Sequence, residues 1–464
     1  WDITRPNDAF DETLHGFGWL DDLAAVGDSG ARELALRWFL QWVDRFGKGT
    51  GPGWKPELAG RRMIRWINHA IFLLNAQPAD VSERYFRAVA QQTRFLSKRW
   101  HGANAGLPRF EALTGLIYAG ISLEGYDRLA SPASRAIAEE CAQQIDPNGG
   151  IPSRNPEELL DVFTLLNWSA SALSEAGLMP QRQHLLAIER IAPTLRALRH
   201  TDGGLARFHG GGRGLEGRLD QALAVSGVRA TATSGLAMGY SRLSAGRTSV
   251  IVDTAAPPET RFSSNAHAST LAMELTSGRR PIIVNCGSGA EFGAEWRRAG
   301  RATPSHSTLS IEGYSSSRFV RHHAGLATED DLLLEAPGDV RVQQSAGLEG
   351  ATILATHDGY SQTHGLLHVR RLDLSINGRE LSGEDTLGAL SESNRIAFEQ
   401  VLNENRLKGV RYAIRFHLHP DVDPTLDLGG AAASLALKSG ELWVFRYDGP
   451  AVLSLEPSVY LEKG

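Results

Sequence analysis

The glycine-rich stretch His209-Gly210-Gly211-Gly212-Arg213-Gly214 divides the chain into two parts with different sequence periodicities. Neither a helix nor a central strand tolerates glycine at this density, because glycine loses much conformational freedom on folding and offers no side chain for packing. We therefore expect a domain boundary just after this stretch, between a first domain over residues 1–217 and a second over residues 218–464. The full length of 464 residues allows each domain to bury a core of its own.

Before this stretch, apolar residues recur at the spacing of an amphipathic helix. Leu34, Trp38, Trp42 and Phe46 share one face of a predicted helix over residues 31–46. The same period returns in the windows 63–74, 85–96, 109–123, 134–145, 157–173 and 182–198. Short breaks with Pro or Gly separate these windows, so sequential helices are expected to pack as antiparallel neighbours. A ring of helical hairpins, an (α/α) toroid, satisfies this pattern.

After the glycine-rich stretch, the period changes toward two. Runs rich in β-branched residues occupy 248–252, 281–284, 307–311 and 366–376, and each run is bounded by Gly, Pro, Asn or Asp. Helices do not alternate with these strands, which excludes a parallel sheet built from βαβ units. The predicted fold class is therefore a multidomain α-then-β protein, in which the N-terminal toroid precedes an antiparallel β-sandwich.

Composition excludes several classes of protein. The formal net charge of −5 speaks against a nucleic-acid-binding protein, although a local basic groove for an anionic sugar chain is compatible with it. No run of about 18 consecutive apolar residues is present, so no membrane span is expected. Only Cys141 and Cys286 occur, which cannot form the disulfide framework of a small secreted scaffold. Such cysteine usage is compatible with the cytoplasm and with the periplasm, and it does not define an oligomeric state.

Four short strings in the second part carry a family resemblance. They are Ser264-Asn265-Ala266-His267-Ala268-Ser269, Asn285-Cys286-Gly287, Ser305-His306-Ser307-Thr308-Leu309 and Leu367-His368-Val369-Arg370-Arg371. In their order and separation they resemble the sandwich motifs of the heparinase II/III-like polysaccharide lyases. The string from Gly53 to Asn68 resembles the arginine-rich toroid segment of the same family, so the resemblance covers most of the chain.

This resemblance implies an acidic polysaccharide as the partner. Characterised members cleave uronic-acid polysaccharides by β-elimination, with a Tyr or His as base and acid and an Asn, His or Arg that neutralises the carboxylate. The reaction requires no cofactor, and some members carry a structural zinc in the sandwich. Asn265, Ser269 and Asn285 stand where the family has His, Asp and Asp, and the toroid Tyr is absent from residues 153–157, so the usual zinc triad and base are incomplete here.

Five residues are candidates for catalysis. Arg154 and Asn155 follow a Gly-Gly turn and could grip a carboxylate, although Asn155 could equally serve only as a helix cap. His209 lies in the glycine-rich loop, where binding residues concentrate. His267 is a candidate acid–base residue or a buried core histidine, and Tyr360 is a candidate base or a structural phenol.

Other residues are candidates for metal or substrate binding. His267, Cys286 and His306 could form a zinc site with one open position, or Cys286 could be an ordinary buried thiol. The predicted substrate-binding residues are Arg109, Glu111, Trp54 and Asn265. Of these, Arg109 and Glu111 could instead form a solvated pair near a helix start.

Three functions remain open. The first is a lyase that cleaves a uronate-containing polysaccharide by β-elimination. The second is a non-catalytic glycan-binding or envelope-polysaccharide assembly protein with a degenerate lyase site. The third is a glycoside hydrolase, which would need two cleft carboxylates such as Glu111 and Glu157.

Overall fold

The computed structural model describes residues 1, 8–230, 235–320 and 332–462, and the chain forms two compact units. The helical unit comprises residues 1–149, 160–192 and 222–229. The β unit comprises residues 150–159, 193–221 and 230–464. The sequence predicts one boundary after residue 217, whereas the chain passes between the units several times, and the glycine-rich loop belongs to the β unit.

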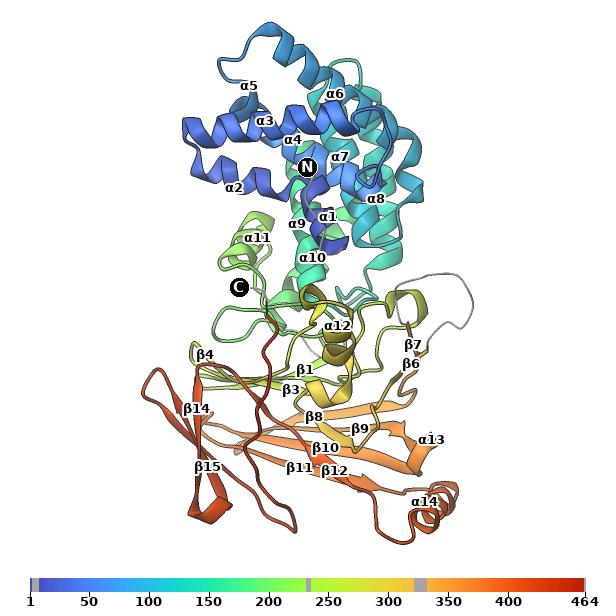
Figure 1. Cartoon of the computed structure of the whole chain (residues 1–464), viewed down its shortest axis with the longest axis vertical. Helices are drawn as coiled ribbons and strands as arrows, with labels where there is room; N and C mark the ends of the chain where they lie inside the picture. The colour runs from blue at the N-terminus through green and yellow to red at the C-terminus, as the bar shows by residue number, and fades with distance from the viewer. Residues whose placement is uncertain (2–7, 231–234, 321–331, 463–464) are drawn as a thin grey trace. The chain divides into compact units, whose positions relative to one another are not determined.

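Helices precede the strands along the chain (Figure 1). They are α1 (Asp8–Gly16), α2 (Gly18–Val26), α3 (Ser29–Phe46), α4 (Pro56–Asn68), α5 (Ala70–Leu74), α6 (Ala79–Arg99), α7 (Leu107–Ser122), α8 (Ala130–Gln144), α9 (Pro156–Glu175), α10 (Arg182–Ala197) and α11 (Arg218–Ser226). Local signals set several starts: the Asp28 carboxylate accepts a hydrogen bond from the Ala31 amide at the start of α3, and α4 and α9 begin with proline.

Close helix packing in the helical unit depends on two glycines. A Cβ atom on Gly60 of α4 would lie 2.2 Å from the main-chain oxygen of Glu111 in α7, and one on Gly115 would lie 2.6 Å from the Gly60 Cα. Any larger residue would therefore push α4 and α7 apart. Beside this crossing, the buried rings of Phe39 and Trp66 lie 4.8 Å apart, edge to face, in an aromatic core.

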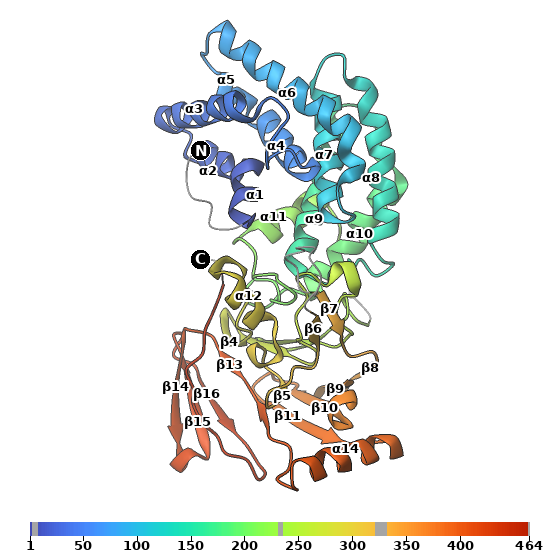
Figure 2. The ribbon, with the colours of Figure 1, turned by 45° about the vertical axis from the view of Figure 1, so that its right-hand side comes forward.

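The β unit contains two larger sheets. The first has the order β1-β2-β3-β4-β13 and the second the order β11-β10-β9-β8, with antiparallel pairing between neighbours. Their strands are β1 (Tyr240–Ala245), β2 (Thr248–Asp253), β3 (Met273–Ser277), β4 (Arg280–Val284), β13 (His417–Leu418), β8 (Val340–Ala346), β9 (Gly350–Tyr360), β10 (Leu366–Ser375) and β11 (Leu381–Gly388). Figure 2 shows the strands of both sheets in the same unit, with helix α14 (Glu392–Glu404) at one end.

Smaller sheets complete the β unit. They pair β5 (Leu309–Ile311) with β12 (Tyr412–Ile414), β6 (Arg318–Val320) with β7 (Leu332–Glu335), and β14 (Val422–Asp427) with β15 (Ala432–Leu437) and β16 (Leu442–Arg446). Short helices α12 (Ala294–Arg301) and α13 (Ser361–His364) interrupt the strands, and the sequence analysis did not anticipate them or α14.

The core of the β unit shows the expected period of two. Along β10, Leu366, His368, Arg370, Leu372 and Leu374 are buried, and the residues between them are more exposed. Leu372 and Leu374 join buried aliphatic side chains from both larger sheets in one cluster, which is how a sandwich excludes water. His368 and Arg370 face inward beside them, so they need polar partners inside the unit.

Within the described ranges, no helix combines the length and apolar character that crossing a membrane requires.

Candidate functional site

Arg154 forms the centre of a buried polar network in the β unit. It precedes α9 with a φ of 52°, a left-handed backbone conformation that few non-glycine residues adopt. All three of its nitrogens donate hydrogen bonds, and the acceptors are the main-chain oxygens of Met238, Gly239, Ala255 and Ala256 and the Asp253 carboxylate. The Arg154 guanidinium is therefore engaged by groups of the protein itself, and its predicted contact with a substrate carboxylate stays a prediction.

Asp253, at the end of β2, joins Arg154 to His209. Its Oδ1 atom lies 2.5 Å from Arg154 Nη2, and its Oδ2 atom lies 3.5 Å from His209 Nε2. Burial alone would raise the pKa of Asp253, but the charge of Arg154 and the hydrogen bond from His209 outweigh it and hold this pKa well below its usual value. Asp253 is thus a buried carboxylate that stays ionised.

His209 is held in one tautomer. Its Nδ1 atom accepts a hydrogen bond from the His267 main-chain amide at 3.1 Å, so the proton of the neutral ring resides on Nε2 and faces Asp253. Burial lowers the pKa of His209, and Asp253 opposes that effect. Since both ring nitrogens are engaged, His209 positions the His267 backbone and offers no nitrogen to a substrate.

His267 and His306 form a second imidazole pair beside this network. His306 Nδ1 lies 2.9 Å from the Ala302 carbonyl oxygen, which can only accept, so the His306 proton is on Nδ1. His306 Nε2 must then accept a hydrogen bond from His267 Nδ1, 2.9 Å away. This leaves His267 Nε2 as an unprotonated lone pair, and that buried atom has no partner among the described residues.

Burial keeps both rings of this pair neutral. It lowers the pKa of His306 to about 3, against the hydrogen bond to Ala302. It also lowers the pKa of His267 well below the usual value, and the neighbouring charges of Arg301 and Arg297 add to this effect. A neutral imidazole whose Nε2 has no hydrogen-bond partner among the described residues can act as a base or as a ligand.

Two arginines of α12 support the loop that carries His267. Arg297 donates to the Ser264 carbonyl oxygen at 2.9 Å and to Asn265 Oδ1 at 3.1 Å, while Arg301 donates to the carbonyl oxygens of Ser263 and Ala266 at 2.8 Å each. Asn265 is exposed, and its amide oxygen accepts the hydrogen bond from Arg297. The predicted substrate-binding residue Asn265 therefore adjoins His267 and a cation.

The remaining predicted residues of the β unit have structural roles. Asn155 Oδ1 accepts hydrogen bonds from the amides of Glu157 and Glu158, which makes it the cap of α9. Tyr360 is fully buried and donates to the Leu309 carbonyl oxygen at 3.1 Å, and burial raises its pKa. The Tyr360 hydroxyl is thus engaged inside the unit, and its role as a base stays a prediction.

The three candidates of the helical unit are engaged separately. Arg109 pairs with Glu140 at 3.0 Å, and Glu111 pairs with Arg61 at 2.5 Å. Burial raises the pKa of Glu111 to about 7, and Arg61 partly offsets this rise. Trp54 is half-buried, and its indole nitrogen donates to the Phe46 carbonyl oxygen, so its ring is packed into the unit instead of forming an open sugar platform. Glu111 and Glu157, the two carboxylates that a hydrolase would need, are both engaged within the protein, because Glu157 accepts a hydrogen bond from the Gly212 amide.

The predicted zinc ligands do not converge. Cys286 Sγ lies 3.3 Å from His417 Nδ1 and 3.8 Å from Ser458 Oγ, and burial raises its thiol pKa. His267 and His306 bind each other directly. Across the ranges that the structure describes, no three His, Cys, Asp or Glu side chains are placed to hold a metal ion. The donor set therefore does not fit a zinc ion.

Sequence reasoning missed Asp253, Arg297 and Arg301. Asp253 directly follows the β-branched run over 248–252, and an acid at a strand end was a signal that could have been used. The two arginines are four positions apart in a helix that was not anticipated, so nothing placed them beside Asn265 and His267.

Comparison with known proteins defines the class. The family described as "Heparinase II/III-like, C-terminal" matches residues 228–464. FtsZ-localized protein C of Caulobacter vibrioides is 30% identical over 468 residues, which cover 100% of this chain and 78% of that protein. Two solved structures resemble the chain in fold. Heparinase III has a TM-score of 0.68 at 13% identity, covering 96% of this chain and 71% of that chain. Heparan sulfate lyase HepC from Pedobacter heparinus has a TM-score of 0.56 at 15% identity, covering 96% and 70%.

Helices followed by antiparallel sheets are thus the toroid-and-sandwich architecture that the sequence predicted. The chain belongs to the heparinase II/III-like family.

Proposed function

We propose that this protein cleaves a uronate-containing polysaccharide by β-elimination, with His267 as the base. The observation that supports this proposal is the ordered pair His306–His267, which leaves the Nε2 lone pair of His267 without a partner in the described ranges. A polar atom in such a position costs about 1–3 kcal/mol unless something uses it. Membership of the heparinase II/III-like family supports this choice of substrate class.

The chemistry needs one base and one group that neutralises the carboxylate. His267 Nε2 removes the C5 proton of the uronate, and the electron pair of that C–H bond forms the C4=C5 double bond as the C4–O bond breaks. The same nitrogen then returns its proton to the leaving oxygen. No cofactor is needed for these steps.

Asn265 and Arg297 are the proposed carboxylate-binding groups. Arg297 donates a hydrogen bond to the amide oxygen of Asn265, so the Asn265 amide nitrogen is oriented to donate elsewhere. A donor of this kind stabilises the negative charge that develops on the uronate carboxylate. His267 Nε2 is covered in the free protein, so the proposal requires the groups over it to move when substrate binds.

The test is the ultraviolet absorbance of the new C=C bond while the protein is incubated with heparan sulfate, alginate, glucuronan and other uronate polysaccharides. The expected result is a rise with the wild type, a loss of about 100-fold or more in H267Q, and a nearly unchanged rate in Y360F. Glutamine fills the site and hydrogen-bonds without acting as a base. A rise that H267Q retains, or one that Y360F abolishes, would remove His267 from this role.

A second candidate is a glycan-binding protein without turnover. It is favoured by the engagement of Arg154, Asn155 and Tyr360 within the protein. The name of the 30% identical relative also gives a location with FtsZ and no reaction. Saturable binding of an acidic polysaccharide without ultraviolet product, together with co-purification with FtsZ, would support this candidate over the lyase.

A further inference from the structure

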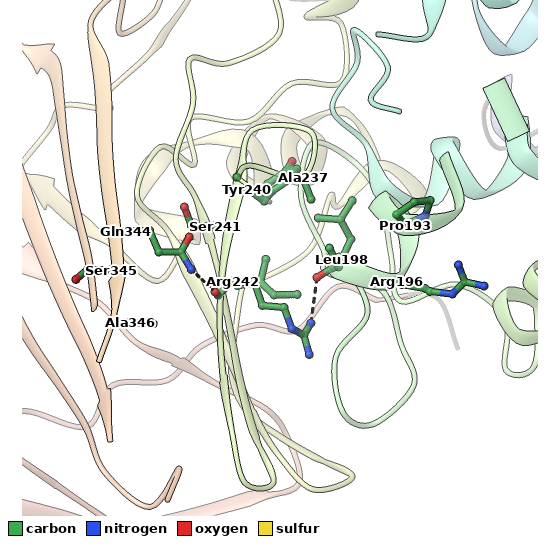
Figure 3. Close-up of a pocket in the computed structure, with 13 residues that line it drawn as sticks. Pro193, Arg196, Leu198, Ala237, Tyr240, Ser241, Arg242, Gln344, Ser345 and Ala346 are labelled. Atoms are coloured by element: carbon green, nitrogen blue, oxygen red, sulfur yellow. Dashed lines mark hydrogen bonds between the residues drawn. The ribbon is translucent and has the colours of Figure 1, made fainter. Parts of the chain in front are cut away.

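A cavity of about 550 Å³ lies in the β unit, between the C-terminal end of α10, strands β1 and β2 and the edge strand β8 (Figure 3). This volume falls in the usual range for sites that bind small molecules. The lining includes Arg196 from the last turn of α10, Leu198 just after that helix, Arg242 from β1, and Gln344 and Ser345 from β8. None of the residues proposed for cleavage lines it.

The lining is positively charged. Among the described residues that line it are Arg196 and Arg242 but no aspartate or glutamate. Within the described part of the chain, Arg242 donates hydrogen bonds through its Nη1 atom alone, to the main-chain oxygens of Ala197, at 3.0 Å, and Arg199. Its Nε and Nη2 atoms are not among the buried polar atoms that lack partners, so solvent or a ligand reaches them.

The contacts of Arg242 with the C-terminal end of α10 explain only part of the position of its guanidinium. A cation at the C-terminal carbonyls of α10 is favourable, since a helix carries a partial negative charge there. That role occupies one of the three guanidinium nitrogens. Burial lowers the pKa of Arg242, and no carboxylate offsets this effect. A partly desolvated cation without an anion is a place where an anion from outside would be stabilised.

We propose that this cavity binds the carboxylate or sulfate group of an acidic sugar, with Arg242 as its anchor. Ser345 and the Gln344 side chain are polar groups of the same lining that hydroxyls of the sugar can meet. Binding of the anion follows from the cavity alone, whereas the sugar portion of the ligand rests on the proposed function.

The test is calorimetric titration of the full chain with sodium sulfate, with glucuronate and with glucose as the uncharged sugar. Two variants probe the site. R242Q removes the anchor, and S345E adds a carboxylate to the lining at an exposed position of β8 without removing any described hydrogen bond. Q343E is the matched control, because Gln343 is exposed on the same strand and does not line the cavity.

Wild type and Q343E are expected to bind sulfate, glucuronate or both, and S345E and R242Q are expected to bind about tenfold more weakly, a change of roughly 1.4 kcal/mol. Binding of sulfate alone, or of glucuronate alone, supports the site and identifies the anionic group. Equal binding of glucose, no binding by the wild type, or unchanged binding in S345E would overturn the proposal. H267Q is expected to keep this binding, so a failed cleavage assay and a failed anion site are distinguishable.

Discussion

Two histidine pairs of the β unit begin alike and end differently. In the open pair, His306 and His267 are joined at 2.9 Å, and the series ends at His267 Nε2, which has no hydrogen-bond partner among the residues that the structure describes. In the closed pair, His357 and His368 are joined at 3.1 Å, and His368 Nε2 then meets Asp385 Oδ1 at 2.7 Å. Arg370 in turn binds Asp385 through two nitrogens.

The tautomers explain this difference. The Gly359 amide donates to His357 Nδ1, so each successive ring nitrogen of the closed pair has a defined partner, and the last donor meets a carboxylate. In the open pair, the first contact is a carbonyl acceptor, which reverses the direction of donation and leaves a lone pair at the far end. The direction in which the first hydrogen bond points therefore separates a structural pair from a candidate site.

Breaking the closed pair should give the largest effect on stability. D385N removes the charge that compensates Arg370, a fully buried cation, and we expect it to lower the free energy of unfolding by about 3–5 kcal/mol. Urea denaturation measures this loss. The control is D373N, whose ion pair with Arg371 on the same strand is largely solvent-exposed and should contribute far less to stability. Equal losses in both variants would show that closure of the pair does not stabilise the fold.

Acidic pH should destabilise the protein through the open pair. The folded-state pKa values of His267 and His306 lie below the unfolded value of 6.5. Below pH 6.5 the unfolded chain therefore binds more protons than the folded chain does. The free energy of unfolding should therefore fall by up to about 1.7 kcal/mol for each such histidine between pH 6.5 and 5.

Urea denaturation at several pH values measures this slope. The double variant H267Q/H306Q cannot take up these protons and should show a shallower dependence than the wild type. A slope that the double variant leaves unchanged would mean that the open pair is already protonated in the folded protein.

Single substitutions of His267 in the open pair and of His368 in the closed pair should differ less in their effect on stability. H267Q keeps a donor for His306 and loses no bond at Nε2, so we expect a loss of about 1–2 kcal/mol, whereas H368Q should cost more because it disturbs the contact with Asp385. Thermal unfolding of the two variants side by side checks the order. The reverse order would indicate that Nε2 of His267 has a stabilising partner in solution.

The smallest effect should come from Y360F. It removes one hydrogen bond to Leu309 and should lower the free energy of unfolding by about 1 kcal/mol or less while leaving the open pair intact. Chemical denaturation and the cleavage assay check the two parts of this expectation. A stable Y360F protein that has lost cleavage would return the phenol to the list of candidate bases.

Among the individual predictions, those that depended on local pattern agreed best with the structure. The helical window over 31–46 lies within the observed α3, and the run over 248–252 lies within β2, because a period of four or of two reflects which face each residue buries. The capping role of Asn155 was one of two alternatives that its position before Pro156 allowed, and the hydrogen bonds of α9 decide for it.

The roles of charged and aromatic residues were less accessible. Arg154 looked available for a substrate because its main partners lie 84 to 102 positions later in the chain. Tyr360 looked like a base for the same reason, since the acceptor of its hydroxyl lies 51 positions earlier. Cys286 was grouped with two histidines that adjoin it only in motif order, and in space it meets His417.

The sequence by itself determined the order of helices and strands, the family and the presence of histidine-containing strings in the β unit. Only the tertiary structure decided which nitrogen of each histidine carries the proton, which arginine is saturated and which lone pair remains open. The physical reason is that secondary structure follows from the spacing of apolar residues along the chain, whereas the state of a buried polar group is set by partners that folding brings from distant segments.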